Sequence, residues 1–318
     1  MYSELQIVHI SGPMEIGLNR EQGVVLCVVK NGEHLIESYI DYYMTLGFRH
    51  IAFLDNNSTD QTIRLAAKNS NVTVLQTKAD FRKNKLKFKH ALMKLFGIGT
   101  WFLIADIDEF FYYPMMDCLG LADFLNYLNA NKFDSVVAQL IDMFPDNTLG
   151  EIKKNPIFSI GAAKWFYSCS QIEKTVYDVP SNTVNNTNIS FWNGGGRKYM
   201  FDMDGLMLTK HPLNFGDGPI TITSNHVIGR RNVADVSGIM AHYKYVGDVY
   251  SHAKDAVVSK QYYRESREYV RYLEQFDSHP DLKFDDPSRI LFTGYPSLES
   301  SELFVSSEHF KDYVNKLA

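Results

Sequence analysis

The chain is poor in cysteine. Only three of its 318 residues are cysteines, Cys27, Cys118 and Cys169, and they are odd in number and widely separated. This spacing excludes a zinc-finger pattern and a disulfide framework, and it fits a protein of a reducing compartment. The first residues contain no basic region followed by an apolar stretch, so we expect no signal peptide.

Long apolar runs and an excess of positive charge are also missing. No stretch reaches the roughly 20 apolar residues that cross a bilayer, so we expect no transmembrane segment. The mixed charge after Tyr250 leaves a peripheral contact with a membrane open. The net charge of −5 argues against nucleic-acid binding, because neutralising phosphates needs a basic surface. We therefore expect a cytoplasmic globular protein.

What the chain does contain is an alternation of apolar runs with helical segments. Continuous apolar runs predict strands at residues 24–29, 50–54, 72–75, 101–105 and 135–141. Helical spacing predicts helices at residues 35–44, 60–68, 85–96, 121–131 and 250–276. Ser58 and Gln61 fit a capping box for the second of these. The alternation predicts an α/β fold with a parallel sheet, and such sheets bind ligands beyond the carboxyl ends of their strands.

The most informative segment is WFLIADIDEFFYYP, in which Asp106 and Asp108 follow an apolar strand. Residues two apart in an extended chain point to the same side. Two carboxylates there suit a hard divalent cation such as Mn²⁺ or Mg²⁺, and without one they would repel each other. An acidic turn after a strand is the alternative, but Glu109 and the aromatic residues that follow favour the metal site.

A second segment, FLDNNSTDQT, places polar residues after another predicted strand. Asp55 ends the strand, and the turn containing Asn57 precedes a helix whose first amides can face an anion. A carboxylate at this point can also accept hydrogen bonds from a base or a ribose. The alternative is that these residues only cap the helix, which is the commoner role of such a pattern taken alone.

Together, VVKNGEH, LDNNSTD and ADIDEF resemble the nucleotide-sugar half of GT-A glycosyltransferases of the family 2 type, over about residues 24–113. A weaker resemblance continues through GGGRKYMF, LTKHPL and AHYKY. It implies a Rossmann-like nucleotide-sugar-binding sheet flanked by helices, with a mixed acceptor-side region and a helical tail. It also implies that Asp55 contacts the nucleotide and that Asp106 and Asp108 hold the diphosphate through a metal. Gly32 departs from the Glu that relatives often carry there.

The resemblance sets the expected boundaries. Residues 1–20 form an N-terminal extension, residues 21–249 the glycosyltransferase domain, and residues 250–318 the helical C-terminal tail. Within the domain, residues 21–115 bind the nucleotide sugar and residues 116–249 the acceptor. The pattern is irregular from residue 145 to about 238, where we expect long loops and antiparallel pieces.

Further residues are candidates for donor or metal binding. The resemblance implies a late histidine among the metal ligands, and His242 matches, although a lone histidine is more often structural. Lys244 lies on the same side as His242 if the chain is extended, where it can bind phosphate. The other donor-binding candidates are basic, and each has the alternative of a solvated face or a turn. They are Lys30, Arg197 after its glycine-rich loop, and Lys85 with Lys89 in the run RKNKLKFKH.

The implied reaction moves a sugar from a nucleotide-sugar donor to a hydroxyl of a saccharide or glycoconjugate acceptor, with inversion, and cell-surface polysaccharide synthesis is the expected setting by analogy. An acidic side chain must remove the acceptor's proton. Spacing does not choose among Asp142, Asp202, Asp204 and Asp217. We place Asp142 and Asp204 first, with a preference for Asp142 because it closes a strand.

Two other functions stay open. A haloacid-dehalogenase-type phosphatase also carries DxD after a strand, but it normally has Thr or Val where this chain has Phe110. A non-catalytic saccharide-binding protein on a degenerate transferase fold is the other, since the sequence does not identify a base.

Overall fold

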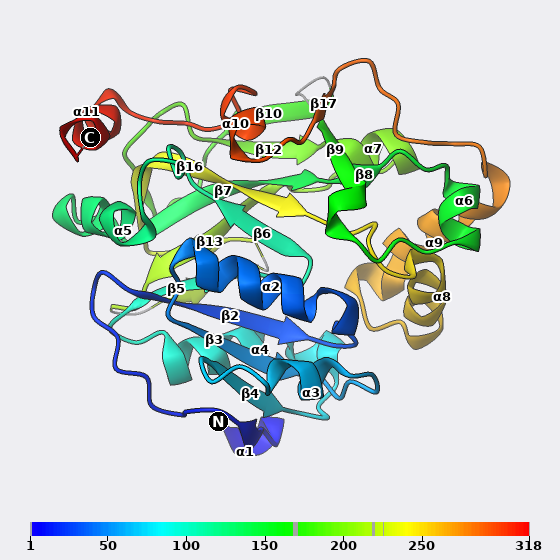
Figure 1. The fold of residues 1–318 in the computed structure, drawn as a ribbon, viewed down its shortest axis with the longest axis horizontal. Coiled ribbons are helices and arrows are strands. Elements are labelled where there is room, and N and C mark those ends of the chain that lie inside the picture. The colour runs from blue at the N-terminus through cyan, green and yellow to red at the C-terminus, as the bar shows by residue number, and fades with distance from the viewer. Residues whose placement is uncertain (1, 168–170, 218–219, 225, 318) are drawn as a thin grey trace.

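A computed structural model describes residues 2–167, 171–217, 220–224 and 226–317. A ten-stranded sheet in the order β1-β4-β3-β2-β5-β13-β7-β16-β11 runs through the molecule, with β6 paired to β16 off this path. Helices cover both faces of its N-terminal half, with α2 on one side and α4 on the other (Figure 1). The fold is a mixed α/β architecture.

The N-terminal half follows the predicted alternation. Its four parallel strands are β2 (Gly23–Val29), β3 (His50–Asp55), β4 (Val72–Gln76) and β5 (Trp101–Ile104). They are connected by α2 (Glu33–Leu46), α3 (Thr62–Ala66) and α4 (Phe81–Phe96). Successive residues of β2 point to opposite faces, so Val25 and Cys27 pack with α2, whereas Val24 and Leu26 pack with α4.

The predicted capping box is wrong. Helix α3 begins only at Thr62, and its N-cap residue Gln61 makes no side-chain capping bond. The hydroxyl of Ser58 instead accepts a hydrogen bond from the backbone N–H of Asn31 at 2.8 Å, and the backbone N–H of Gln61 donates to Glu33 at 2.8 Å. These polar groups tie the loop after β2 to the loop after β3 rather than extending the helix.

The sheet is mixed rather than parallel in its second half. Strand β13 (Thr209–Phe215) lies between β5 and β7 (Ser135–Asp142) and runs antiparallel to both. Strand β16 (Asn232–His242) is parallel to β7 and antiparallel to β6 (Glu109–Tyr112). At the edges, β1 (Val8–Ser11) pairs with β4, and β11 (Thr183–Val184) pairs with β16.

The irregular region contains loops, short antiparallel pairs and short helices, as expected. Strand β10 (Ile172–Val176) pairs with β12 (Ser190–Gly194), and β14 (Thr221–Ile222) pairs with β15 (Ile228–Gly229).

The remaining elements are α5 (Leu121–Ala130), β8 (Phe144–Pro145), α6 (Leu149–Lys154), the 3-10 turn η1 (Ile160–Ala162), β9 (Ala163–Tyr167) and α7 (Gly196–Phe201).

The C-terminal residues form two helices where one helical stretch was predicted. Helix α8 (Val249–Ser259) ends at Lys260, which adopts a left-handed conformation with φ of 52°, and α9 (Tyr263–Ser278) follows. Strand β17 (Arg289–Leu291), α10 (Tyr295–Glu299) and α11 (Glu308–Leu317) complete this region, and β17 pairs with β9. At the other end, α1 (Tyr2–Leu5) lies near β4 (Figure 1).

Cys27 is buried and Cys118 exposed, both as free thiols, whereas Cys169 lies outside the described residues. Among the described helices, none combines the length and the apolar composition that crossing a bilayer requires.

Candidate functional site

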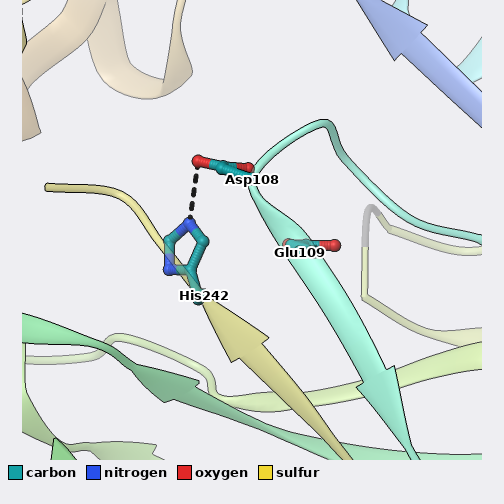
Figure 2. Close-up of side chains that lie close together, drawn as sticks. All are labelled: Asp108, Glu109 and His242. Carbon is teal, nitrogen blue, oxygen red and sulfur yellow. Dashed lines mark ion pairs between the residues drawn. The ribbon is translucent and has the colours of Figure 1, made fainter. Parts of the chain in front are cut away.

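Acidic and imidazole side chains converge at the ends of β5, β6 and β16. Asp106 and Asp108 lie in the turn between β5 and β6, Glu109 begins β6, and His242 ends β16. The strand register places His242 opposite Glu109 on one side and opposite Asp142 on the other. Three possible ligand atoms lie within 4.8 Å of one another: a carboxylate oxygen of Asp108, a carboxylate oxygen of Glu109 and a ring nitrogen of His242 (Figure 2).

His242 lies between two carboxylates. Its Nε2 is 3.2 Å from Oδ2 of Asp108, and its Nδ1 is 2.6 Å from Oδ1 of Asp142. Burial lowers the pKa of His242, but Asp108 and Asp142 outweigh burial and raise the pKa to about 9. Burial raises the pKa of Asp108, and the charge of His242 overcomes this and holds that pKa well below its usual range.

Asp106 has different partners from Asp108. Its Oδ1 is 3.6 Å from Nζ of Lys89, and its Oδ2 is 3.7 Å from Nζ of Lys210. Burial raises the pKa of Asp106, but the two ammonium groups bring it down to about 2. Lys210 also contacts Glu109, whose other carboxylate oxygen accepts the backbone N–H of Asp106 at 3.1 Å. The carboxylate of Glu109 is therefore already engaged on both oxygens.

The two aspartates are accessible although protein surrounds them. The side chain of Asp106 is 43% exposed and that of Asp108 is 27% exposed. Burial is nevertheless the largest single influence on both pKa values. The partly exposed carboxylate of Asp108 and the adjacent Nε2 of the buried His242 match the ligands that Mn²⁺ accepts, so the residues present fit such an ion.

The loops after β2 and β3 form the adjoining part of the site. Asp55 is buried, and its carboxylate accepts hydrogen bonds from the backbone N–H of Ser58 and from Gln76 Nε2, both at 3.0 Å. Lys30 and Asn57 are exposed, and Asn57 adopts a left-handed conformation with φ of 59°. The structure thus gives Asp55 a role in shaping the turn, and its predicted contact with a nucleotide stays a prediction.

Gly32, the departure from the family pattern, packs directly against the acidic turn. A Cβ atom at this position would lie 2.8 Å from Cγ2 of Val29 and 3.1 Å from Cγ1 of Ile107. Ile107 is the residue between the two aspartates. A side chain at position 32 would therefore displace this turn or the end of β2.

Two lysines of the basic run lie on the inner side of α4. Lys89 is buried and reaches Asp106, as described above. Lys85 is half-buried, and its pKa is lowered by burial and by the neighbouring charge of Lys89. Lys87, in contrast, is exposed and pairs with Glu4 at 3.8 Å.

Arg197 and Lys244 belong to a buried charge network behind His242. Nε of Arg197 is 3.0 Å from Oδ2 of Asp142, and its NH1 is 3.2 Å from Oε1 of Glu268. Nζ of Lys244 is 3.5 Å from the same oxygen of Glu268. Burial raises the pKa of Glu268, but Lys244 and Arg197 together hold it far below its usual range.

The other candidate bases are exposed. Asp204 pairs with Lys198 at 3.2 Å, and Asp202 pairs with Arg271 at 3.2 Å. Asp217 is exposed as well. None of the three belongs to the cluster around Asp108 and His242 in the described residues.

Sequence reasoning missed two members of the site. Lys210 stands in the LTKHPL segment, but β13 was not predicted, so nothing placed this lysine beside Asp106. Glu268 stands in α9, where a glutamate among charged residues gives no signal of its inward contact with Arg197.

Comparisons with known proteins add little to this geometry. No protein-family model matches the chain, and no curated protein matches it. Among solved structures, the crystal structure of S. aureus TarS matches at 17% identity with a TM-score of 0.32. The match covers 43% of this chain and 27% of that chain, so the matched part spans about a quarter of the TarS structure. A likeness of this extent carries no argument about function.

Proposed function

We propose that this protein is a metal-dependent glycosyltransferase that moves a sugar from a nucleotide-sugar donor to a hydroxyl of a saccharide acceptor, with inversion. The observation that carries the proposal is the convergence of Asp108 and His242 in an accessible site at the carboxyl ends of the sheet strands. The resemblance of LDNNSTD and ADIDEF to family 2 glycosyltransferases supplies the reaction class.

Asp108 and His242 would hold Mn²⁺ or Mg²⁺ through a carboxylate oxygen and through Nε2, and the predicted part of Asp106 as a further ligand stays a prediction, since its carboxylate lies beside Lys89 and Lys210. When bound, the ion would supply positive charge to the donor's phosphates and to the departing nucleoside diphosphate. On the other side of the turn, Nζ of Lys89 and Nζ of Lys210 lie 3.6 and 3.7 Å from the carboxylate of Asp106, and Lys85 is half-buried beside Lys89. These ammonium groups would add to the attraction for the donor's phosphates.

The acceptor's proton needs a base that a bound acceptor can reach. Asp142 is engaged on both oxygens, which leaves Asp202, Asp204 and Asp217 as the exposed members of the predicted set. We expect alanine replacement of one of these three to abolish transfer while donor binding is kept. If all three variants transfer sugar normally, the base is a residue outside this set.

Thermal unfolding with UDP, GDP, CDP and dTDP, each with and without MnCl₂, tests the proposed class. We expect one diphosphate to raise Tm only when the cation is present, and Asp108→Ala to abolish this rise. Asp123→Ala, an exposed carboxylate on α5, is the matched control and should behave like the wild type.

Turnover assays then separate the three functions. Mn²⁺-dependent hydrolysis or transfer from a nucleotide sugar supports the transferase. Nucleotide stabilisation without any turnover would instead indicate a saccharide-binding protein. Hydrolysis of a generic phosphoester in the absence of nucleotide sugars would indicate a phosphatase.

A further inference from the structure

We propose that Asp142 is a positioning residue that fixes the ring of His242 for metal binding, and that it is not the base of the reaction. This inference rests on the proposed function, because the orientation of His242 matters to sugar transfer only if this residue holds the ion. Asp142 ends β7 directly opposite His242 at the end of β16, although the two are 100 residues apart in the chain.

The contact between Asp142 and His242 selects one nitrogen of the ring. Oδ1 of Asp142 is 2.6 Å from Nδ1 of His242, and a carboxylate at that distance accepts the Nδ1–H hydrogen bond. Nε2 is then the nitrogen that faces Asp108, at 3.2 Å, and an ion bound there would displace the proton that Nε2 carries in the charged ring. Histidines that bind metals commonly donate their other ring N–H to a carboxylate, which sets the tautomer and holds the ring in place.

The surroundings of Asp142 are unsuited to a general base. Its side chain is 1% exposed, and its second oxygen is 3.0 Å from Nε of Arg197. A base must come within hydrogen-bonding distance of the hydroxyl that it deprotonates. An acceptor hydroxyl could reach Asp142 only by displacing either His242 or Arg197.

A second layer of contacts holds Asp142 in its charged form. Arg197, from α7, is shared between Asp142 and Glu268, and Glu268 also pairs with Lys244. The charges of Arg197 and Lys244 thus balance those of the two carboxylates, so these four side chains can stay charged without the ion. Because Glu268 belongs to α9, the C-terminal region takes part in orienting His242.

Asp142→Asn tests the inference with the smallest change in shape. The amide nitrogen can donate to Nδ1 and leave the proton on Nε2, where it would compete with the ion. An Asp-to-Asn change favours the wrong histidine tautomer in the same way in catalytic triads. In calorimetric titrations with MnCl₂ we expect the dissociation constant to rise about 10- to 100-fold. An unchanged dissociation constant would overturn the proposal.

Asp235→Asn is the matched control. Asp235 is a buried aspartate like Asp142. It belongs to β16, towards the opposite end of that strand from His242, and it accepts hydrogen bonds from Tyr127 and Ser307. Its replacement should leave the affinity for Mn²⁺ unchanged. An equal loss in both variants would show that any buried aspartate has this effect, and the specific role of Asp142 would be lost.

A double-mutant cycle tests whether Asp142 acts through His242. His242→Gln should itself weaken Mn²⁺ binding, and adding Asp142→Asn to it should cause no further loss. Additive losses would mean that Asp142 acts independently of the ring. If the wild type binds no Mn²⁺ at all, the proposed function fails. If the wild type binds Mn²⁺ and Asp142→Asn binds it with the same affinity, only the positioning role fails.

Turnover of a nucleotide sugar distinguishes positioning from base catalysis. If Asp142 positions the ring, saturating MnCl₂ should bring kcat of Asp142→Asn back towards the wild-type value. A missing base would instead lower kcat at every Mn²⁺ concentration. If Asp142→Asn does not fold, NMR of ¹⁵N-histidine-labelled wild-type protein still tests the proposal. On addition of Mg²⁺ we expect the ion to bind Nε2 of His242 while Nδ1 keeps its proton. Binding at Nδ1 would overturn the proposal.

Discussion

Replacing Lys210 with methionine should destabilise the protein strongly. The side chain of Lys210 is 8% exposed and that of Glu109 is 3% exposed, and the two form a buried ion pair. In Lys210→Met the carboxylate of Glu109 stays buried and keeps only the backbone N–H of Asp106 as a partner. Removing one member of a buried pair in this way costs about 3–5 kcal/mol in the free energy of unfolding.

This loss is a large part of the roughly 5–15 kcal/mol that holds a folded domain together. Urea unfolding followed by tryptophan fluorescence measures it. With an m value of about 3 kcal/mol/M, the midpoint should fall by about 1–1.7 M. The comparison variant is Lys198→Met, whose partner Asp204 is exposed, and it should lose only about 0–1 kcal/mol.

Adding Glu109→Gln to Lys210→Met should recover stability. Glutamine keeps an acceptor for the N–H of Asp106 but carries no charge, so the double variant removes the unpaired carboxylate that makes the single variant costly. The reasoning is refuted if Lys210→Met unfolds within about 1 kcal/mol of the wild type, or if the double variant is less stable than the single one.

Two further predictions concern His211 and Gly32. Burial lowers the pKa of His211 to about 4, whereas in the unfolded chain it is about 6.5, so the unfolded state binds the proton first as the pH falls. This residue should therefore leave the free energy of unfolding unchanged above about pH 6.5 and lower it by about 3 kcal/mol as the pH drops to 4. Tm measured across this range should fall less steeply in His211→Gln, and an identical slope would contradict the assignment. Gly32→Ala should cost about 1–3 kcal/mol in urea unfolding and weaken Mn²⁺ binding, because the new Cβ meets Val29 and Ile107. A variant with wild-type stability and affinity would show that the acidic turn adjusts freely.

The N-terminal half of the sheet was predictable because its strands are apolar on both faces. Buried parallel strands such as β2 read as continuous runs of branched residues, and the helices between them carry one apolar stripe. The ends of these strands could therefore be located, and the acidic turn at Asp106 and Asp108 with them.

Strand β13 could not be predicted because four of its seven buried residues are polar. Thr209, Lys210, His211 and Asn214 all lie inside the sheet. Their hydrogen-bonding partners come from distant segments: Thr209 donates to Gln139, and Lys210 to Glu109. Period and hydrophobicity carry no record of such pairings. The segment therefore fell within the region where we expected loops and antiparallel pieces, and the main sheet was expected to be parallel.

The role of Asp142 escaped sequence reasoning for a related reason. The sequence shows that Asp142 ends a strand, and a base at the active site would be expected at the same kind of position. The register between β7 and β16 places His242 opposite Asp142, and the packing of α7 brings Arg197 to its other carboxylate oxygen. Neither contact can be inferred from the sequence.

Asp108 and His242 should together hold a divalent cation that takes part in donor binding. The most direct measurement is anomalous diffraction from crystals grown with MnCl₂ and the nucleoside diphosphate that raises Tm. We predict one manganese peak between the Asp108 carboxylate and Nε2 of His242, in contact with phosphate oxygens. A nucleotide bound with no such peak, or manganese held elsewhere, would contradict the account.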